Sequence, residues 1–336
     1  MKILFELSKD HDTLPLSEVF CCLKAEDISY DVIDKNKDVV ICDLDCSIDK
    51  VNLLSKRFSS VFFVNEYLFT SSLEIKELEN KAKGSPICIQ GTVAVRYKNR
   101  SNKKFDSQKV VKTLASIYTK NNEVSLENPD NEVRAIITNK KIYVGLKLFE
   151  INRSVFEERK VQNRPFFSPI SLHPKVALGL VNLSCLKKGE TLLDPFCGTG
   201  GIILEAGLIG IKVIGNDIEE KMVNGTKMTL EEYGINDFDL FCEDIGNLSE
   251  KIKPVDAVVT DFPYGKSTTT KGEDMDKLYS RAFSSIKKSL KEGRRAVIGL
   301  PNKKSIKAAE KYFTLLEIYE FRAHKSLTRY FAVFEN

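Results

Sequence analysis

A short apolar run at residues 255–260 ends in a carboxylate and is followed by a proline and a tyrosine. The exocyclic amino nitrogen of a nucleobase is a poor nucleophile, because its lone pair is delocalised into the ring. Two adjacent acceptors, the Asp261 carboxylate and the Phe262 carbonyl, would take hydrogen bonds from both N–H groups and aim the lone pair at an electrophile. Pro263 fixes its own φ, and Tyr264 offers a ring on which a base can stack. The segment predicts methylation of an exocyclic amine, although Asp and Pro are also common in ordinary strand-end turns.

A second apolar run, residues 191–193, also ends in a carboxylate, Asp194, and a turn containing Gly198 and Gly200 follows. This turn differs from a dinucleotide fingerprint, because the third glycine position holds Ile203. A carboxylate beside such a turn repels a pyrophosphate but suits the ammonium and sulfonium groups of S-adenosylmethionine. The pattern therefore predicts a site for this methyl donor.

Two further strand-like runs end in acid. Asp217 lies 217 − 194 = 23 residues after Asp194, where an acidic residue is placed for ribose hydroxyls. Asp244 is placed to accept a hydrogen bond from the adenine amino group. Helical patterns alternate with these strands, which indicates a mainly parallel sheet that binds ligands at the carboxyl ends of its strands. We expect an α/β, Rossmann-like class I methyltransferase domain in the C-terminal half, with an antiparallel hairpin at residues 313–334.

Composition is that of a multi-domain cytoplasmic enzyme. The chain has 336 residues, for which two or three domains are expected, and a formal net charge of +4. We find no apolar run of about 18 residues, so no membrane span is expected, and eight cysteines without a secretory signal are expected to be reduced thiols. No metal site is expected, because Cys42 and Cys46 have no matching Cys or His pair nearby. We interpret Cys197 as a packed thiol, not a nucleophile.

Charge is distributed unevenly along the chain. Residues 1–50 hold 12 acidic and 6 basic side chains, whereas residues 81–115 hold nine basic side chains against Asp106 alone. Such a basic cluster is typical of a phosphate-binding surface, and a merely solvated face is the alternative. Alternation along residues 93–100 places basic side chains on one face of a strand. The RNA-binding residues predicted from this pattern are Arg96, Lys98, Arg100, Lys103 and Lys104.

The first half of the chain predicts two small α+β units and a linker. Residues 1–69 fit a ferredoxin-like domain. Residues 70–152 resemble the THUMP domain of RNA-modifying enzymes, through Gly91-Thr92-Val93-Ala94-Val95-Arg96, through residues 124–130 and through the strand pair that follows. Residues 153–175 contain three prolines and predict a stiff linker before the methyltransferase domain at 176–336. The whole chain resembles the archaeal tRNA guanosine-10 N2-methyltransferases and their eukaryotic relatives.

This resemblance implies roles for individual residues. It makes Asp261, Phe262, Pro263 and Tyr264 the family's Asp-Pro-Pro-Tyr catalytic motif, from which Phe262 departs because the family usually has proline there. It implies S-adenosylmethionine as cofactor and tRNA as partner, with the THUMP-like unit recognising the acceptor end. The cofactor-binding residues that it implies are Asp194, Pro195, Cys197, Gly198, Gly200, Asp217, Ile218, Asp244 and Ile245, with Phe167 and Ser168 of the linker covering the cofactor.

Three alternatives stay open at this point. A methyltransferase for another tRNA or ribosomal RNA guanosine would use the same chemistry. A DNA amino-methyltransferase shares the catalytic motif but normally carries a DNA target-recognition domain. A non-catalytic RNA-binding protein with a vestigial methyltransferase fold would be expected to lose the acidic positions, which are intact here. The sequence leaves open whether one or two methyl groups are transferred, whether a small activating subunit is needed, and the oligomeric state.

Overall fold

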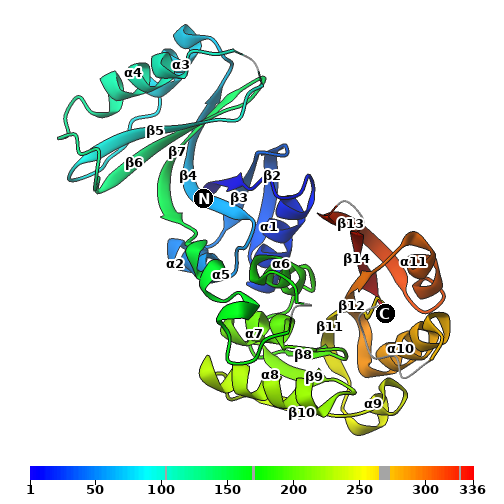
Figure 1. Cartoon of the computed structure of the whole chain (residues 1–336). Helices are drawn as coiled ribbons and strands as arrows, with labels where there is room; N and C mark the ends of the chain where they lie inside the picture. The colour runs from blue at the N-terminus through cyan, green and yellow to red at the C-terminus, as the bar shows by residue number, and fades with distance from the viewer. Residues whose placement is uncertain (103, 169–170, 265–272, 325–326) are drawn as a thin grey trace. The chain divides into compact units, whose positions relative to one another are not determined.

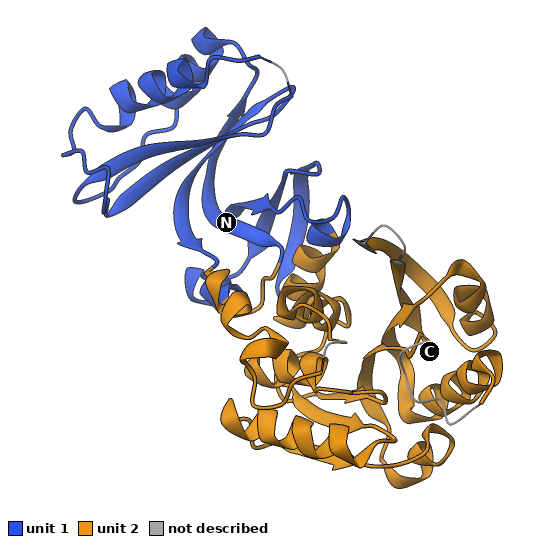
Figure 2. Ribbon diagram, viewed as in Figure 1, with its two compact units in different colours: residues 1–16, 28–55, 60–151 blue, residues 17–27, 56–59, 152–336 orange. Residues whose placement is uncertain are grey.

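The computed structural model describes every residue except 103, 169–170, 265–272 and 325–326. The chain divides into two compact units (Figure 2), which we call the N-terminal unit and the C-terminal unit. The N-terminal unit comprises residues 1–16, 28–55 and 60–151, and the C-terminal unit comprises residues 17–27, 56–59 and 152–336. Helix α1 (Leu14–Ala25) begins in the first unit and ends in the second. Each unit has a sheet of its own.

The sheet of the N-terminal unit has the strand order β2-β3-β1-β4-β7-β6-β5 in the described residues. Neighbouring strands are antiparallel except β5 and β6, which run parallel. Helices α3 and α4 cover one face of β5, β6 and β7 (Figure 1), and their side chains Leu78 and Leu114 are buried in the core on this face. The elements are β1 (Lys2–Leu7), β2 (Ser29–Lys35), β3 (Val39–Asp45), α2 (Ile48–Leu53), β4 (Val61–Ser71), α3 (Ile75–Lys83), β5 (Val93–Asn99), α4 (Ser107–Tyr118), β6 (Asn131–Ile137) and β7 (Ile142–Glu150).

Strand β4 runs straight through the domain boundary expected at residues 69 and 70. It pairs with β1 on one side and with β7 on the other. The strands of the ferredoxin-like and THUMP-like parts therefore share one continuous sheet in the N-terminal unit, although the sequence predicts two separate domains. A polar–apolar alternation shows that a strand exists, but it does not show which strands pair on its two edges.

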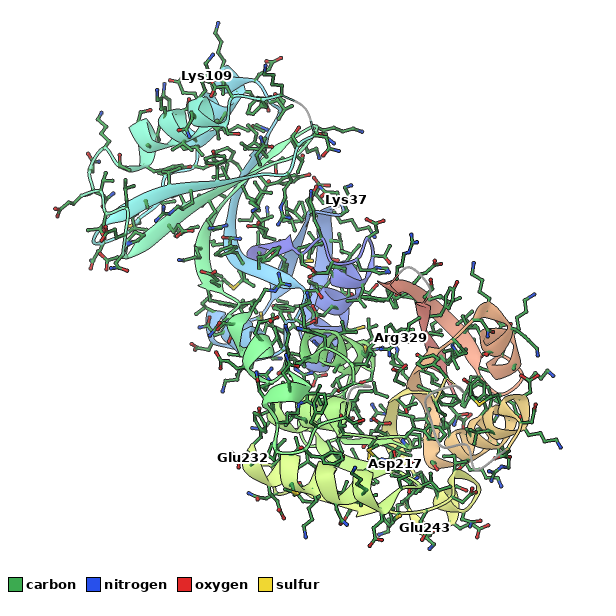
Figure 3. All side chains as sticks on the ribbon, in the orientation of Figure 1. Lys37, Lys109, Asp217, Glu232, Glu243 and Arg329 are labelled. Carbon is green, nitrogen blue, oxygen red and sulfur yellow. The ribbon has the colours of Figure 1, made fainter. Side chains whose placement is uncertain are left out.

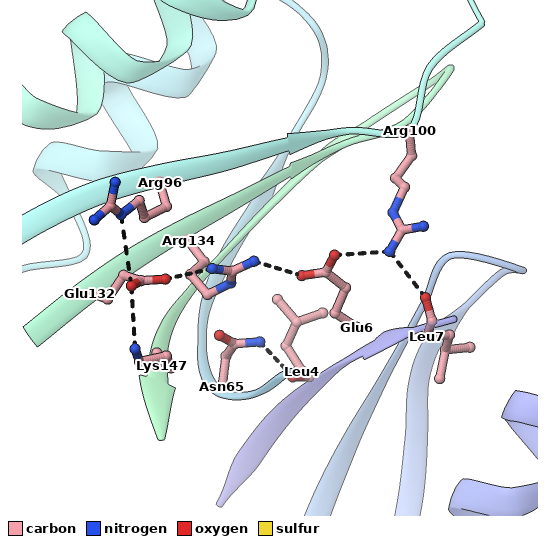
Figure 4. A network of polar contacts seen from close by, with 9 residues as sticks. All are labelled: Leu4, Glu6, Leu7, Asn65, Arg96, Arg100, Glu132, Arg134 and Lys147. Carbon is pink, nitrogen blue, oxygen red and sulfur yellow. Dashed lines mark hydrogen bonds and ion pairs between the residues drawn. The ribbon is translucent and has the colours of Figure 1, made fainter. Parts of the chain in front are cut away.

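A buried charge network crosses this sheet (Figure 4). The side chain of Glu6 on β1 is only 2% exposed and accepts from Arg100, at 2.9 Å, and from Arg134 of β6, at 3.1 Å. Arg134 also pairs with Glu132 at 2.5 Å, and Lys147 of β7 lies 3.3 Å from the same Glu132 carboxylate. A buried carboxylate needs such partners, because removal from water disfavours its charge. The network ties the first strand of the chain to the THUMP-like part.

The sheet of the C-terminal unit has the order β10-β9-β8-β11-β12-β14-β13 in the described residues. Strands β10, β9, β8, β11 and β12 are parallel, and β14 and β13 close the sheet as an antiparallel hairpin. This is the Rossmann-like arrangement that the sequence predicts. The elements are α5 (Ser154–Glu158), α6 (Pro174–Leu183), β8 (Thr191–Asp194), α7 (Gly201–Leu208), β9 (Lys212–Asn216), α8 (Glu220–Glu232), β10 (Phe238–Phe241), α9 (Ile245–Lys251), β11 (Val255–Asp261), α10 (Met275–Ser289), β12 (Leu290–Leu300), α11 (Lys303–Ala309), β13 (Thr314–His324) and β14 (Leu327–Glu335).

Two elements of this unit show how the sequence sets the site. Strand β11 is buried along its length until Asp261, as expected for a central parallel strand with both faces covered. Helix α10 begins at the cap Asp274, whose side chain accepts from two backbone N–H groups. Its apolar stripe, which includes Tyr279 and Phe283, packs in the core beside β11. The helices of the described residues fall short of the length and apolar content of a membrane span.

Candidate active site

One cavity of about 360 Å³ lies at the carboxyl ends of the parallel strands in the C-terminal unit. All four carboxylates that the sequence predicts at strand ends line it, because parallel strands end at the same edge of a sheet. Pro195, Gly200 and Phe167 do not line it; the Phe167 side chain is 57% exposed. The predicted residues that the structure does gather there are Ser168, Asp194, Cys197, Gly198, Asp217, Ile218, Asp244, Ile245, Asp261, Phe262, Pro263 and Tyr264.

The glycine turn after β8 is held by its neighbours. Gly198 and Gly200 have φ values of 52° and 74°, which L side chains rarely adopt. The Thr226 hydroxyl donates to the Gly198 carbonyl at 2.8 Å, and a Cβ at Gly200 would meet Thr226 Cγ2 at 2.8 Å. Asp217 accepts from the Gly198 N–H at 3.0 Å. Gly200 therefore leaves room for Thr226 beside the turn, whereas Gly198 and Asp217 line the cavity.

Burial controls the charge of the innermost carboxylate. Asp194 is 1% exposed, and its burial raises its pKa to about 7. Burial also raises the pKa of Asp217, which accepts from the Glu219 N–H at 2.9 Å. Ionised carboxylates in such surroundings gain from a cationic ligand nearby. The donor set fits a ligand with ammonium and sulfonium charges and with ribose hydroxyls.

The Asp244 carboxylate has more partners within the protein than the sequence predicts. It caps α9 by accepting from the Gly246 N–H at 2.8 Å, and it pairs with both terminal nitrogens of Arg281, at 2.5 and 3.1 Å. Arg281 also pairs with Glu273 at 2.7 Å. Asp244 lines the cavity, but an adenine amino group would share its carboxylate with this arginine.

The turn after β11 is fixed by hydrogen bonds and ring packing. The Tyr264 hydroxyl donates to Asp261, and the Tyr279 hydroxyl donates to the Pro263 carbonyl at 2.7 Å. The ring of Phe262, 1% exposed, stacks on Phe283 with centroids 5.2 Å apart. The ring that departs from the family's motif thus packs in the core, and its effect on the shape of the cavity is limited to the wall that this ring forms.

Two family models match two separate parts of the chain. A model described as an RMKL-like methyltransferase domain matches residues 162–330, and a THUMP domain model matches residues 73–147. The chain is 34% identical to a tRNA (guanine(10)-N2)-dimethyltransferase of Methanothermobacter thermautotrophicus, over 100% of this chain and 99% of the relative. It is 38% identical to the enzyme of the same name from Pyrococcus abyssi, over 74% and 75% of the two chains.

The chain belongs to the tRNA (guanine(10)-N2)-dimethyltransferase family. Its fold is also that of TrmN from Thermus thermophilus, with a TM-score of 0.60 and 19% identity over 100% of both chains. A second solved structure, titled a putative methyltransferase complexed with SAH, has a TM-score of 0.56 at 12% identity and covers 99% of this chain and 98% of its own. These two likenesses concern the fold alone.

Only some of the basic side chains predicted to bind RNA are exposed to solvent. Lys98 and Lys104 are exposed, and Arg96 is half-exposed while donating to the Leu126 carbonyl. Arg100 is buried and paired with Glu6. The prediction that Arg100 binds RNA requires an exposed side chain, so it is wrong. Lys103 lies outside the described residues. The predicted RNA-binding residues that keep exposed surface among the described residues are Arg96, Lys98 and Lys104.

Sequence reasoning missed two residues next to Asp261. Gly299 of β12 pairs with Asp261 on the neighbouring strand β11. Arg329 of β14, which is labelled in Figure 3, lies 3.5 Å from the Asp261 carboxylate. They follow Asp261 by 38 and 68 residues, since 299 − 261 = 38 and 329 − 261 = 68. Neither belongs to a recognisable motif, so only the strand order reveals them.

Proposed function

We propose that this protein methylates the exocyclic N2 of guanosine in tRNA, with S-adenosylmethionine as methyl donor and guanosine 10 as the site. One observation carries the chemistry: the Asp261 carboxylate ends β11 at a cavity that Asp194 and Asp217 also line. The names of the relatives support the nucleotide and the transfer of two methyl groups to it.

The carboxylates fit the methyl donor by charge. Asp194 would hold its cationic end, Asp217 its ribose hydroxyls, and Asp244 with Ile218 and Ile245 its adenine. When bound, S-adenosylmethionine supplies a methyl group whose carbon–sulfur bonding pair passes to sulfur as the N2 lone pair forms the new carbon–nitrogen bond. The proton on N2 becomes acidic only as this bond forms, and it leaves to solvent afterwards.

The chain's own residues orient the amino group. Asp261 and the Phe262 carbonyl accept its two N–H groups, so that the lone pair is freed from the ring and directed at the electrophile. Catalysis is then mostly positioning, with the Asp261 charge stabilising the positive charge that grows on nitrogen. The Arg329 guanidinium lies 5.3 Å from the centroid of the Tyr264 ring, so a base would stack on the opposite face of that ring.

The THUMP-like part would hold the tRNA while the cavity takes the base. The exposed Lys98 and Lys104, with Arg96, offer charge to phosphates. The guanosine must leave its stack to reach a strand-end cavity, at a cost of a few kcal/mol. Docking at the acceptor end would offset this cost.

The test is identification of the product. The protein is incubated with S-adenosylmethionine and unmodified tRNA transcripts, which are then digested for mass spectrometry of nucleosides. We expect N2-methylguanosine followed by N2,N2-dimethylguanosine, and loss of both in a matched transcript with adenosine at position 10. Methylation of a ring nitrogen, a carbon or a ribose would contradict the Asp261 geometry, because such targets offer no exocyclic amino group to the acceptor pair. N2-methylguanosine keeps one exocyclic N–H for that pair, so the second transfer is consistent with it.

The same assay separates the parts of the proposal. Labelling of another guanosine in the substituted transcript would keep the chemistry and refute the position. An isolated D-stem hairpin should be a poor substrate, because it lacks the acceptor end. Efficient methylation of this hairpin would remove the THUMP-like part from substrate selection.

A further inference from the structure

Strand β12 carries a gap in its row of side chains beside the catalytic carboxylate. Gly299 is the partner of Asp261 on β11 and of Phe331 on β14. A Cβ at Gly299 would lie 2.2 Å from Asp261 Oδ1 and 3.0 Å from Phe331 Cε1. The Asp261 carboxylate thus occupies the space that any side chain at 299 would fill. A glycine inside a strand commonly marks such a close approach.

Arg329 approaches the Asp261 carboxylate from β14, two strands away from β11. It precedes Phe331 by two residues on β14, so both side chains lie on the same face of the sheet. Its Nη1 lies 3.5 Å from Asp261 Oδ2, and its side chain is 16% exposed against 17% for Asp261. Arg329 does not line the cavity, so it acts on a base only through Asp261 and the Tyr264 ring.

The Asp261 carboxylate is therefore held from two directions. Tyr264 donates its hydroxyl to Oδ1, and Arg329 faces Oδ2. Each carboxylate oxygen has two lone-pair directions, so acceptor capacity remains for an amino group. Without the arginine, the carboxylate would pivot about a single hydrogen bond.

Among the described residues, Arg329 is also the cation that faces Asp261. Burial raises the pKa of Asp261, and Arg329 opposes that rise. Asp194 on β8 is a second carboxylate in the same field, and the charge of Asp261 contributes to raising its pKa. The remaining titratable neighbours, Tyr264 on the turn and Tyr279 on α10, have raised pKa values because of burial and stay neutral. A protonated Asp261 would lose both its charge and one acceptor oxygen.

We propose that Arg329 is a positioning residue that keeps Asp261, which lies in the space left by Gly299, ionised and aimed at the amino group during methyl transfer. This inference rests on the proposed function. It adds a requirement that the turn motif does not contain: an arginine on the closing hairpin and a glycine on the strand between.

The test compares pH profiles of kcat at saturating tRNA and S-adenosylmethionine for the wild type, Arg329→Gln and Arg329→Lys. An adjacent opposite charge lowers the pKa of a carboxyl by about 1 to 3 units. The acid limb of Arg329→Gln should therefore move to higher pH by about one unit or more, with kcat about tenfold lower on that limb and recovering as pH rises. Arg329→Lys should restore most of the profile. The KM for S-adenosylmethionine should stay within about twofold, because Arg329 does not line the cavity.

Arg322→Gln is the matched control, because it removes the same charge from an exposed position on β13. It should leave kcat and the acid limb at wild-type values.

Gly299→Ala should lower kcat at every pH, since a Cβ displaces the carboxylate itself, and melting temperatures of all variants identify any loss of folding. An Arg329→Gln profile that coincides with the wild type, or that falls equally at all pH values and is not restored by lysine, overturns the proposal. A wild type that methylates no exocyclic amine overturns the proposed function and this inference with it, whereas an active wild type with an unchanged variant overturns this inference alone.

Discussion

Arg100→Ala should destabilise the N-terminal unit and leave tRNA binding nearly unchanged. The arginine is buried, pairs with Glu6 at 2.9 Å and donates to the Leu7 carbonyl at 3.2 Å. Removing one partner of a buried ion pair costs about 3–5 kcal/mol, because the other charge stays out of water. Glu6 keeps Arg134 at 3.1 Å, so we expect the low end, about 3 kcal/mol.

A loss of about 3 kcal/mol is large enough to measure by calorimetry. A domain of this size loses about 3 °C in melting temperature per kcal/mol, so the calorimetric transition of the N-terminal unit should fall by about 9 °C. Hydrogen exchange should quicken in β1 and β6, which carry Glu6 and Arg134. Combining Arg100→Ala with Glu6→Gln should cost at least about 1 kcal/mol less than the sum of the single changes, because the stranded charge is gone.

Lys98→Ala is the matched control on the same basic segment. Lys98 is exposed, so its removal should change stability by less than about 0.5 kcal/mol. It should instead weaken tRNA binding. The reasoning would be refuted by the opposite pattern, in which Arg100→Ala melts like the wild type and binds tRNA poorly, because a buried, paired arginine has no means of contacting a phosphate.

Three further outcomes are expected. Asp261→Ala should lower kcat by about a hundredfold or more in the nucleoside assay, while calorimetry finds S-adenosylmethionine binding little changed; undiminished turnover would remove Asp261 from the mechanism. Lys98→Ala with Lys104→Ala should weaken tRNA affinity and flatten its salt dependence, because fewer counterions are released; an identical slope would make this a solvated face. Burial raises the pKa of Asp194 to about 7, so S-adenosylmethionine affinity should fall as pH drops below about 7. The free energy of unfolding should also fall as pH rises from about 4 to 7, because Asp194 ionises in the unfolded chain before it does in the folded one. Affinity independent of pH between 6 and 8 would contradict an ionised Asp194 at the ligand.

The cavity residues were predictable because each signal is local. An apolar run that ends in acid places that acid at a strand end, and parallel strands bring successive ends together. This logic correctly gathers Asp194, Asp217 and Asp261, which lie far apart in the chain. It also yields the order of elements in the C-terminal unit, including the antiparallel closing hairpin.

Arg100 shows where local signals stop. Alternation along residues 93–100 predicts basic side chains on one face of a strand, but the burial of Arg100 depends on Glu6 of β1, which lies 94 residues earlier in the chain. The same limit applies to β4, whose two edges pair with strands from both expected domains. Exposure and domain boundaries are properties of pairing between distant segments, so neither can be obtained from a window of sequence.

At Phe262 the sequence predicts the position in the motif, and the structure shows the contacts that hold it. Its backbone N–H donates to the Gly299 carbonyl at 3.1 Å, a bond that the family's usual proline cannot make, because proline has no N–H. Its ring packs edge-on against Phe196 and Tyr279, at 5.0 and 5.2 Å between centroids. The departure from the motif therefore replaces the stiffness of a proline with a bond to β12 and an aromatic anchor. The chemistry needs only the carbonyl of residue 262, and these attachments hold that carbonyl beside the glycine gap where Asp261 lies.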